Sequence, residues 1–262
     1  MEAVENGVYR RTSATGTVQV AFDPSGPALH VKLTGDVDDT LARVRHVFDP
    51  EGAHLPSVHA HLASDALLAP LLARRPGLRI PAGWDGFEQA VRAVLGQQVS
   101  IPAARRLAGQ LAALCGTPSG DPLLSRRFPT AAAVARADLA TLGMPAARRR
   151  ALYALAGAVL ADPALLRHPA SPDHPARLLA VPGIGPWSAQ YIMLRAFRDP
   201  DAFPASDVGL LRAATVAGVR LKPEALARQA EAWRPWRAYA AQHLWTGELA
   251  DSADTCHARS WN

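Results

Sequence analysis

Two segments near the N-terminus, residues 16–22 and 29–34, alternate hydrophobic and polar side chains. Residues 23–27 lie between them and combine two prolines with aspartate, serine and glycine, a composition typical of a tight turn. The period of two predicts an antiparallel pair of strands. Hydrophobic residues then recur at helical spacing over 38–48, which predicts a helix across that pair. Two strands with one face to cover are marginal alone, so this module must pack against the rest of the chain.

From residue 57 onward the strand pattern gives way to short helical periods separated by proline and glycine. Asp85 and Ser100 each precede such a period as an expected N-cap. The predicted helices cover residues 57–72, 86–95, 101–114, 130–136, 137–142, 146–160, 175–180, 187–197, 206–217, 223–230 and 235–246. The fold class is therefore α+β, with a small antiparallel β/α module over 1–80 and a mainly helical domain over 81–262.

Composition narrows the class of protein. Hydrophobic residues make up 49% and charged residues 19% of the 262, enough to build a core and too apolar for intrinsic disorder. No segment approaches the ~20 apolar residues of a membrane helix, and acids stand where a signal peptide would carry bases. Only Cys115 and Cys256 occur, so a four-cysteine iron–sulfur site cannot form within this chain. We expect a protein of the reducing cytoplasm that does not contact a membrane.

Basic residues are unevenly distributed along the chain. The formal net charge is +5, and residues 74–150 hold twelve arginines against four acids, a local net of +8. The planar guanidinium suits phosphate, so this excess favours a polyanionic partner. Lys32 and Lys222 are the only lysines in the chain, however, so a general replacement of lysine by arginine explains the excess equally well. Arg148, Arg149 and Arg150 are open to both interpretations, as phosphate contacts or as a solvated face.

The most informative segment is 178–189, where two short predicted helices flank a turn formed by Pro182, Gly183, Ile184 and Gly185. Glycine lets backbone N–H groups approach an oxyanion closely, and the N-terminus of the second helix points at the same place. The pattern matches the helix-hairpin-helix motif, which binds one phosphate of a DNA strand regardless of sequence. The alternative is an ordinary joint between two helices.

Asp207 follows Gly185 by twenty-two residues, and with it the chain resembles the helix-hairpin-helix superfamily of DNA glycosylases. The branch that it resembles is the inducible bacterial 3-methyladenine DNA glycosylase (glycosylase II), and residues 76–81, 87–97 and 233–237 carry the similarity further. The resemblance implies a β/α module beside a helical domain of two lobes with a cleft between them. Longer members of the family begin with a further strand and helix, so we expect this module to be short and the base pocket to be wider.

The resemblance also implies roles for individual residues. Asp207 takes the place of the catalytic aspartate, and Trp187, Tyr191 and Trp245 match positions that line the pocket for a flipped base. Gln97 and Gln98 follow Gly96 in the loop that contacts DNA, and Gln98 stands where relatives commonly insert a leucine into the helix. The family further implies a monomer, no required cofactor, and a monovalent cation (Na⁺ or K⁺) held by hairpin carbonyls.

Chemistry then separates the branches of the superfamily. Members that cleave the strand carry a lysine two residues past the second hairpin glycine, and here that residue is Trp187. Without an amine, Schiff-base catalysis is not expected, which leaves hydrolysis. Ser206 is the expected N-cap of the next helix and places Asp207 in its first turn, where the helix N-terminus favours the ionised carboxylate. We expect that carboxylate to stabilise a cationic sugar.

These inferences combine into one predicted function. Alkylation at N3 or N7 makes a purine cationic, and an aromatic face attracts such a base by ~0.5–2 kcal/mol. We therefore expect a monofunctional glycosylase that removes 3-methyl- or 7-methylpurines from double-stranded DNA and leaves an abasic site. Two alternatives remain: a non-catalytic DNA-binding protein, and a glycosylase for mispaired or oxidised bases. His54, His59 and His61 lack an acid or cysteine to complete a metal site, so none is predicted.

Overall fold

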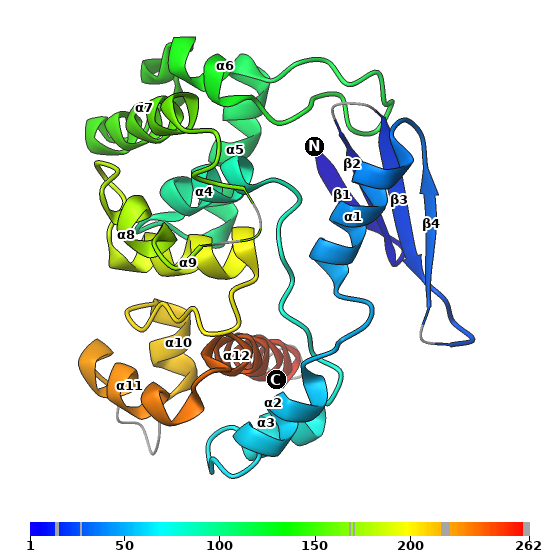
Figure 1. The fold of residues 1–262 in the computed structure, drawn as a ribbon, viewed down its shortest axis with the longest axis vertical. Helices are drawn as coiled ribbons and strands as arrows, with labels where there is room; N and C mark the ends of the chain where they lie inside the picture. The colour runs from blue at the N-terminus through cyan, green and yellow to red at the C-terminus, as the bar shows by residue number, and fades with distance from the viewer. Residues whose placement is uncertain (14–15, 27, 168, 170, 216–220, 259–262) are drawn as a thin grey trace.

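A computed structural model describes residues 1–13, 16–26, 28–167, 169, 171–215 and 221–258 of the chain. An antiparallel sheet stands at one side of the molecule, and the helical part occupies the rest (Figure 1). The strands of the sheet are β1 (Glu2–Glu5), β2 (Val8–Thr12), β3 (Thr17–Phe22) and β4 (Leu29–Leu33), in that spatial order. The predicted α+β class is confirmed.

The sheet is twice as wide as the sequence pattern predicts. Strands β3 and β4 match the predicted pair, whereas β1 and β2 were not predicted. The alternation of β2 is obscured because Arg11, on its core-facing side, is buried beside Glu88. Asn6 and Gly7, with φ of 50° and 76°, join β1 to β2. An Asn-Gly pair is a strong hairpin signal, and it marked this turn in the sequence.

Helix α1 (Val37–Phe48) covers one face of the sheet, as expected (Figure 1). Asp36 caps it by accepting the N–H of Asp39 at 3.0 Å. Its buried valines pack against the valines of β3 in a small hydrophobic core, which also takes in a tryptophan at residue 84. The buried members of this core are Val18, Val20, Val44, Val47 and Trp84.

The remaining helices build the larger part of the molecule. They are α2 (Leu55–Leu62), α3 (Ala69–Arg74), α4 (Gly86–Gly96), α5 (Ile101–Cys115), α6 (Ala131–Arg136), α7 (Ala146–Ala161), α8 (His174–Leu179), α9 (Pro186–Phe197), α10 (Val208–Ala213), α11 (Pro223–Ala230) and α12 (Arg237–Ala258), with 3₁₀ turns at Leu139–Leu142 and Glu231–Trp233. Helices α4 to α9 form one group, and α10 to α12 form a second group together with α2 and α3 (Figure 1).

Four predicted helices differ from the observed ones. The single helix over 57–72 is two, because Asp65 interrupts it and accepts the N–H groups of Leu67 and Leu68. The helix over 137–142 is a 3₁₀ turn from Leu139. The helix expected over 206–217 is α10, which ends at Ala213, and residues 216–217 of that prediction lie outside the described part. The last, predicted over 235–246, is α12, which runs from Arg237 to Ala258.

One hydrophobic core joins both groups of helices. Helix α4 packs against α9, and α12 packs against α10 and α3. Leu62 and Leu72, from helices that precede residue 80, belong to this large core, so the division of the chain at residue 80 stays a prediction. Within the described residues, no helix is both long enough and apolar enough to cross a membrane.

Candidate active site

The turn between α8 and α9 exposes its main chain. Val181 and Ile184 are buried, at 6% and 5% exposure, and anchor the turn in the core, while Pro182, Gly183 and Gly185 are exposed. Gly183 has φ of +91°, and a Cβ there would lie 2.4 Å from the Cβ of Ala151 on α7. No described residue accepts the N–H of Gly183 or Gly185. These amides and the start of α9 therefore present donors to solvent, as an anion site requires.

Gln97 ties the neighbouring loop to this hairpin. Its Nε2 donates to the carbonyl oxygen of Gly183 at 3.0 Å and to Oγ of Ser188 at 2.9 Å. Arg148, at the start of α7, donates to the carbonyl oxygen of Gln97. Thus Gln97 and Arg148 hold the two loops together, an arrangement that residue spacing did not indicate.

Gln98 lies at the tip of that loop. It is exposed and has a φ of 54°, in the left-handed region that non-glycine residues seldom adopt. The loop runs between α4, which ends at Gly96, and α5, which Ser100 caps by accepting the N–H of Ala103. Gln98 is thus presented to solvent in the loop that Gln97 ties to the hairpin.

Asp207 is itself the N-cap of α10, and the expectation that Ser206 holds this place is wrong. The Asp207 backbone is extended, with φ −64° and ψ 128°, and its Oδ1 accepts the N–H of Leu210 at 3.0 Å. Serine and aspartate are equally good caps, so the local sequence does not distinguish them. Residues far away in the chain, which bond to Asp207, decide which of the two residues caps the helix.

Those partners are two indoles. Trp187 on α9 donates its Nε1–H to Oδ2 of Asp207 at 3.0 Å, and Trp245 on α12 donates its Nε1–H to Oδ1 at 2.8 Å. Together with the N–H of Leu210, they surround the half-buried carboxylate with neutral donors. Three helices, α9, α10 and α12, meet at this one side chain, which fixes its orientation.

The aromatic residues expected in the base pocket lie together around it. The rings of Trp187 and Tyr191 are stacked, with centroids 5.1 Å apart and planes at 16°. Tyr191 meets Trp245 edge to face at 6.4 Å and 67°. All three side chains are partly exposed. The structure thus brings Asp207, Trp187, Tyr191 and Trp245 into one partly exposed group of side chains, and we use the name aromatic cleft for this group of four residues.

A charged residue that the sequence did not single out also enters this cleft. The Cζ of Arg195 lies 5.6 Å from the Tyr191 ring centroid and 5.2 Å from that of Trp245. Residues 187, 191 and 195 are spaced by four along α9, so they share one helix face. This spacing was the feature of the sequence from which the position of Arg195 beside the rings could have been predicted.

The arrangement defines what the cleft can do chemically. Neutral N–H groups fix a carboxylate in position without bringing an opposite charge to it. Aromatic faces beside it can bind a flat heterocycle. The combination suits a reaction in which positive charge develops on a group next to an aromatic ring.

The histidines of α2 pair with the backbone. His59 and His61 each contact a backbone carbonyl oxygen, of Pro76 and Ala232. Among the described residues, no group of three His, Cys, Asp or Glu side chains is placed to bind a metal ion. The hairpin carbonyls of Leu178, Val181 and Gly183 each already accept one hydrogen bond. The monovalent cation at the hairpin stays a prediction.

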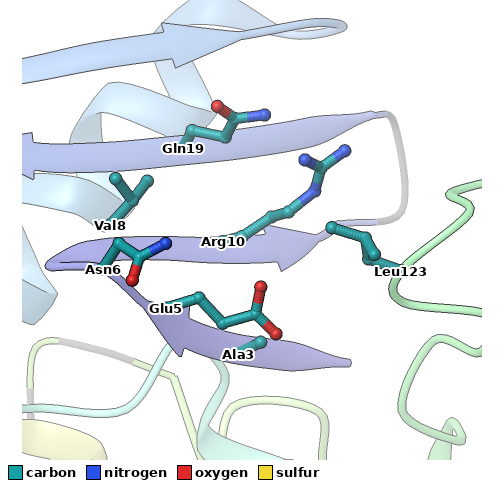
Figure 2. A pocket seen from close by; sticks show the side chains of 7 residues that line it. All are labelled: Ala3, Glu5, Asn6, Val8, Arg10, Gln19 and Leu123. Atoms are coloured by element: carbon teal, nitrogen blue, oxygen red, sulfur yellow. The ribbon is translucent and has the colours of Figure 1, made fainter.

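A pocket of about 230 Å³ lies elsewhere, on the face of the sheet opposite α1 (Figure 2). Arg10 is held there by Asp121, at 2.8 Å between Nη2 and Oδ2. The pocket is lined by Ala3, Glu5, Asn6, Val8, Arg10, Gln19 and Leu123. None of these residues belongs to the aromatic cleft or to the hairpin.

Comparison with known proteins places the chain among relatives. Residues 1–85 match the model of the AlkA N-terminal domain. A probable bifunctional transcriptional activator/DNA repair enzyme AlkA of Mycobacterium tuberculosis is 42% identical over 94% of this chain and 51% of its own. The chain therefore spans about half the length of that relative. The DNA-3-methyladenine glycosylase 2 of Escherichia coli is 35% identical over 95% of this chain and 88% of its own.

The fold is shared with a solved structure. A 3-methyladenine DNA-glycosylase from Archaeoglobus fulgidus superposes with a TM-score of 0.82 at 20% identity, over 95% of this chain and 89% of the other. At that identity the likeness concerns the fold, and it includes both the sheet and the helical part.

Proposed function

The chain belongs to the family of DNA-3-methyladenine glycosylases of the AlkA type, and we propose that it is itself a monofunctional DNA glycosylase for alkylated bases. The observation that carries the proposal is the position of Asp207, fixed by two indole N–H groups within a cluster of aromatic rings. The substrate is double-stranded DNA with 3-methyl- or 7-methylpurines. The protein acts as a monomer in the cytoplasm and requires no cofactor.

The proposed reaction is the hydrolysis of an N-glycosidic bond. The C1′–N bond breaks, its electron pair leaves with the base, and the sugar becomes an oxocarbenium-like cation. A purine that alkylation has made cationic leaves as a neutral base and needs no added proton. The Asp207 carboxylate stabilises the sugar cation, and a water oxygen then bonds to C1′ while its proton passes to Asp207 or solvent. The product is an abasic site.

The loops around the cleft would bind the duplex. The exposed amides of Gly183 and Gly185, together with the first turn of α9, are suited to one phosphate. Extruding a base costs a few kcal/mol, and the exposed side chain of Gln98 would fill the gap left in the helix. Gln97 supports both loops through its contacts with Gly183 and Ser188.

Strand cleavage is not part of the proposal. Trp187 occupies the position of the Schiff-base lysine, and its indole is engaged by Asp207. The lysines of the chain lie elsewhere, Lys32 on β4 and Lys222 at the N-cap of α11, and both are exposed. A scaffold that only bound DNA would need neither Asp207 nor the rings around it.

Incubation with duplexes that carry one 7-methylguanine tests this function. The wild-type protein should release the free base and leave an intact strand that breaks only when heated in alkali. Asp207→Asn should bind the duplex and release base about a hundredfold to a thousandfold more slowly. Equal release by both proteins would remove Asp207 from its role, and borohydride trapping of a covalent complex would contradict hydrolysis. Release of 8-oxoguanine but not of 7-methylguanine would favour the oxidised-base alternative.

A further inference from the structure

Arg195 extends the stack of rings along α9. Trp187 and Arg195 lie one helical turn to either side of Tyr191, so the indole and the guanidinium approach that ring from opposite directions along the helix. The guanidinium also lies 5.2 Å from the Trp245 ring centroid. A protein cation is therefore already close to two of the three rings that would receive a flipped base.

The guanidinium is held in this position by the segment that leads into α4. Arg195 Nη1 donates to the carbonyl oxygen of Pro81 at 3.0 Å. Its own carbonyl oxygen accepts the N–H of Gly83 at 2.6 Å. Both ends of the residue are thus fixed to the same three-residue segment, so its positive charge is a permanent feature of the aromatic cleft.

We propose that Arg195 is a specificity-determining residue, which weakens the preference of the aromatic cleft for cationic bases and so admits neutral damaged bases. The proposal rests on the proposed function and deepens it, because it concerns which lesions the same site accepts. The observation that supports this proposal is the position of the Arg195 guanidinium next to the rings of Tyr191 and Trp245.

Two physical effects act in the same direction. A ring attracts a cation through its electron-rich face, and a face that already interacts with a guanidinium has less attraction left for a second cation. The fixed charge also repels a cationic base across a partly buried site, where the effective dielectric is well below that of water. A neutral base of the same shape experiences neither penalty. The ratio of cationic to neutral base excision therefore falls because Arg195 is present.

The test compares two lesions in otherwise identical duplexes, one with 7-methylguanine, which is cationic, and one with hypoxanthine, which is neutral. Arg195→Gln removes the charge and keeps a polar amide at this position. It should raise the ratio of kcat/KM for 7-methylguanine over hypoxanthine about tenfold. Arg195→Lys retains the charge and should keep the ratio of the wild type. Arg228→Gln, which removes an exposed charge on α11, is the matched control and should leave the ratio unchanged.

A binding measurement keeps the proposal independent of catalysis. Quenching of tryptophan fluorescence by 1-methylnicotinamide, a flat cation, and by neutral nicotinamide reports the same selectivity without any reaction. Arg195→Gln should tighten binding of the cation about tenfold relative to the neutral probe, with its thermal unfolding checked against the wild type. A ratio unchanged from the wild type in this assay would overturn the role of Arg195. If the wild-type protein releases no base but Arg195→Gln still shifts the binding ratio, the proposed function is wrong and the effect of Arg195 on binding stands.

Discussion

Two carboxylates of this molecule are held firmly, but by opposite means. Glu88, at the junction between the sheet and α4, is 1% exposed and bonded to the guanidinium groups of Arg11 and Arg92. Asp207, in the aromatic cleft, is half-buried and bonded to Trp187 and Trp245 and to the backbone N–H of Leu210. The donors to Glu88 are charged, and those to Asp207 are neutral.

The difference shows how one chemical group serves either structure or reaction. Burial on its own would raise the pKa of Glu88, but the guanidinium of Arg11, and then that of Arg92, outweigh it and lower the pKa below its usual value. Glu88 therefore stays charged, and its charge is cancelled by its neighbours. The donors to Asp207 orient the carboxylate and cancel none of its charge, which leaves that charge available to a cation formed in the cleft.

The largest effect on stability is expected at Glu88, because it belongs to the buried ion pairs at the junction. Glu88→Gln removes the buried counter-charge of the Arg11 guanidinium and leaves it only the partly exposed Glu2, which should cost about 3–5 kcal/mol of folding stability. Urea unfolding measures this loss, and Glu224→Gln, an exposed change on α11, should lie within ~0.5 kcal/mol of the wild type. Base release per folded molecule should stay near the wild-type rate, because Glu88 is not in the cleft. Unchanged stability would mean that the junction does not depend on this ion pair.

The converse change at Asp207 should act on the reaction instead of the fold. Asp207→Asn should raise the barrier to base release by ~3–4 kcal/mol. Its effect on folding should be at most about 2 kcal/mol, because asparagine caps a helix as well as aspartate does and only the bond from one indole is lost. Single-turnover release and urea unfolding of the same preparation give both numbers. If the loss of folding free energy exceeds the increase in the barrier to base release, Asp207 has a structural role like that of Glu88.

His243, a buried histidine on α12, should make the stability of the fold depend on pH. Burial, and to a smaller extent His59 and Arg75, lower the pKa of His243 to about 4, from 6.5 in the unfolded chain. The unfolded chain thus binds the proton first, and the stability that the neutral ring provides is complete above pH 6.5 and is lost between about pH 6.5 and 4. By pH 5 the loss should reach about 2 kcal/mol. The contribution of Glu88, whose pKa is lowered, persists in this range and is lost only below its usual value of 4.5.

Urea unfolding at pH 7 and at pH 5 separates these two windows. His243→Gln should lose about 2 kcal/mol less stability than the wild type between the two pH values. His30→Gln, which removes an exposed ring on β4 that pairs with Asp23, should follow the wild type to within ~0.5 kcal/mol, because exposed ion pairs contribute little. If His243→Gln shows the same acid dependence as the wild type, the ring is not responsible for it.

The hairpin was predictable because its signals are local. Val181 and Ile184 anchor a turn whose glycines expose their amides, and all of this is contained within twelve residues of sequence. Asp207 was assigned from the resemblance, in which an aspartate follows the hairpin at this spacing from Gly185. The grouping of Trp187, Tyr191 and Trp245 followed from resemblance, and the roles assigned to these residues stay predictions.

Features that depend on distant partners were not predictable. Ser206 and Asp207 are equally good caps, and the choice is made by indoles 20 and 38 residues away from Asp207. The alternation of β2 was obscured because Arg11 faces the core, where it meets Glu88 from 77 residues away, although the Asn6-Gly7 turn before β2 was a local signal. The roles of Gln97 and Arg195 likewise depend on backbone carbonyl oxygens brought close only by the fold.

The smallest effect tests whether neutral donors serve to orient Asp207. Trp245→Phe keeps an aromatic ring beside Arg195 but removes the N–H that bonds Oδ1 of Asp207 at 2.8 Å. A hydrogen bond to a charged group contributes about 1.5 kcal/mol or more, so base release should slow about tenfold.

Trp236→Phe is the matched control, because Trp236 packs edge to face on Tyr239 and touches neither Asp207 nor Tyr191 in the described contacts. Trp187→Phe should slow release to a similar degree, and the double variant should fall short of the sum, since both indoles orient one carboxylate. Full additivity would mean that each indole acts on the base rather than through Asp207.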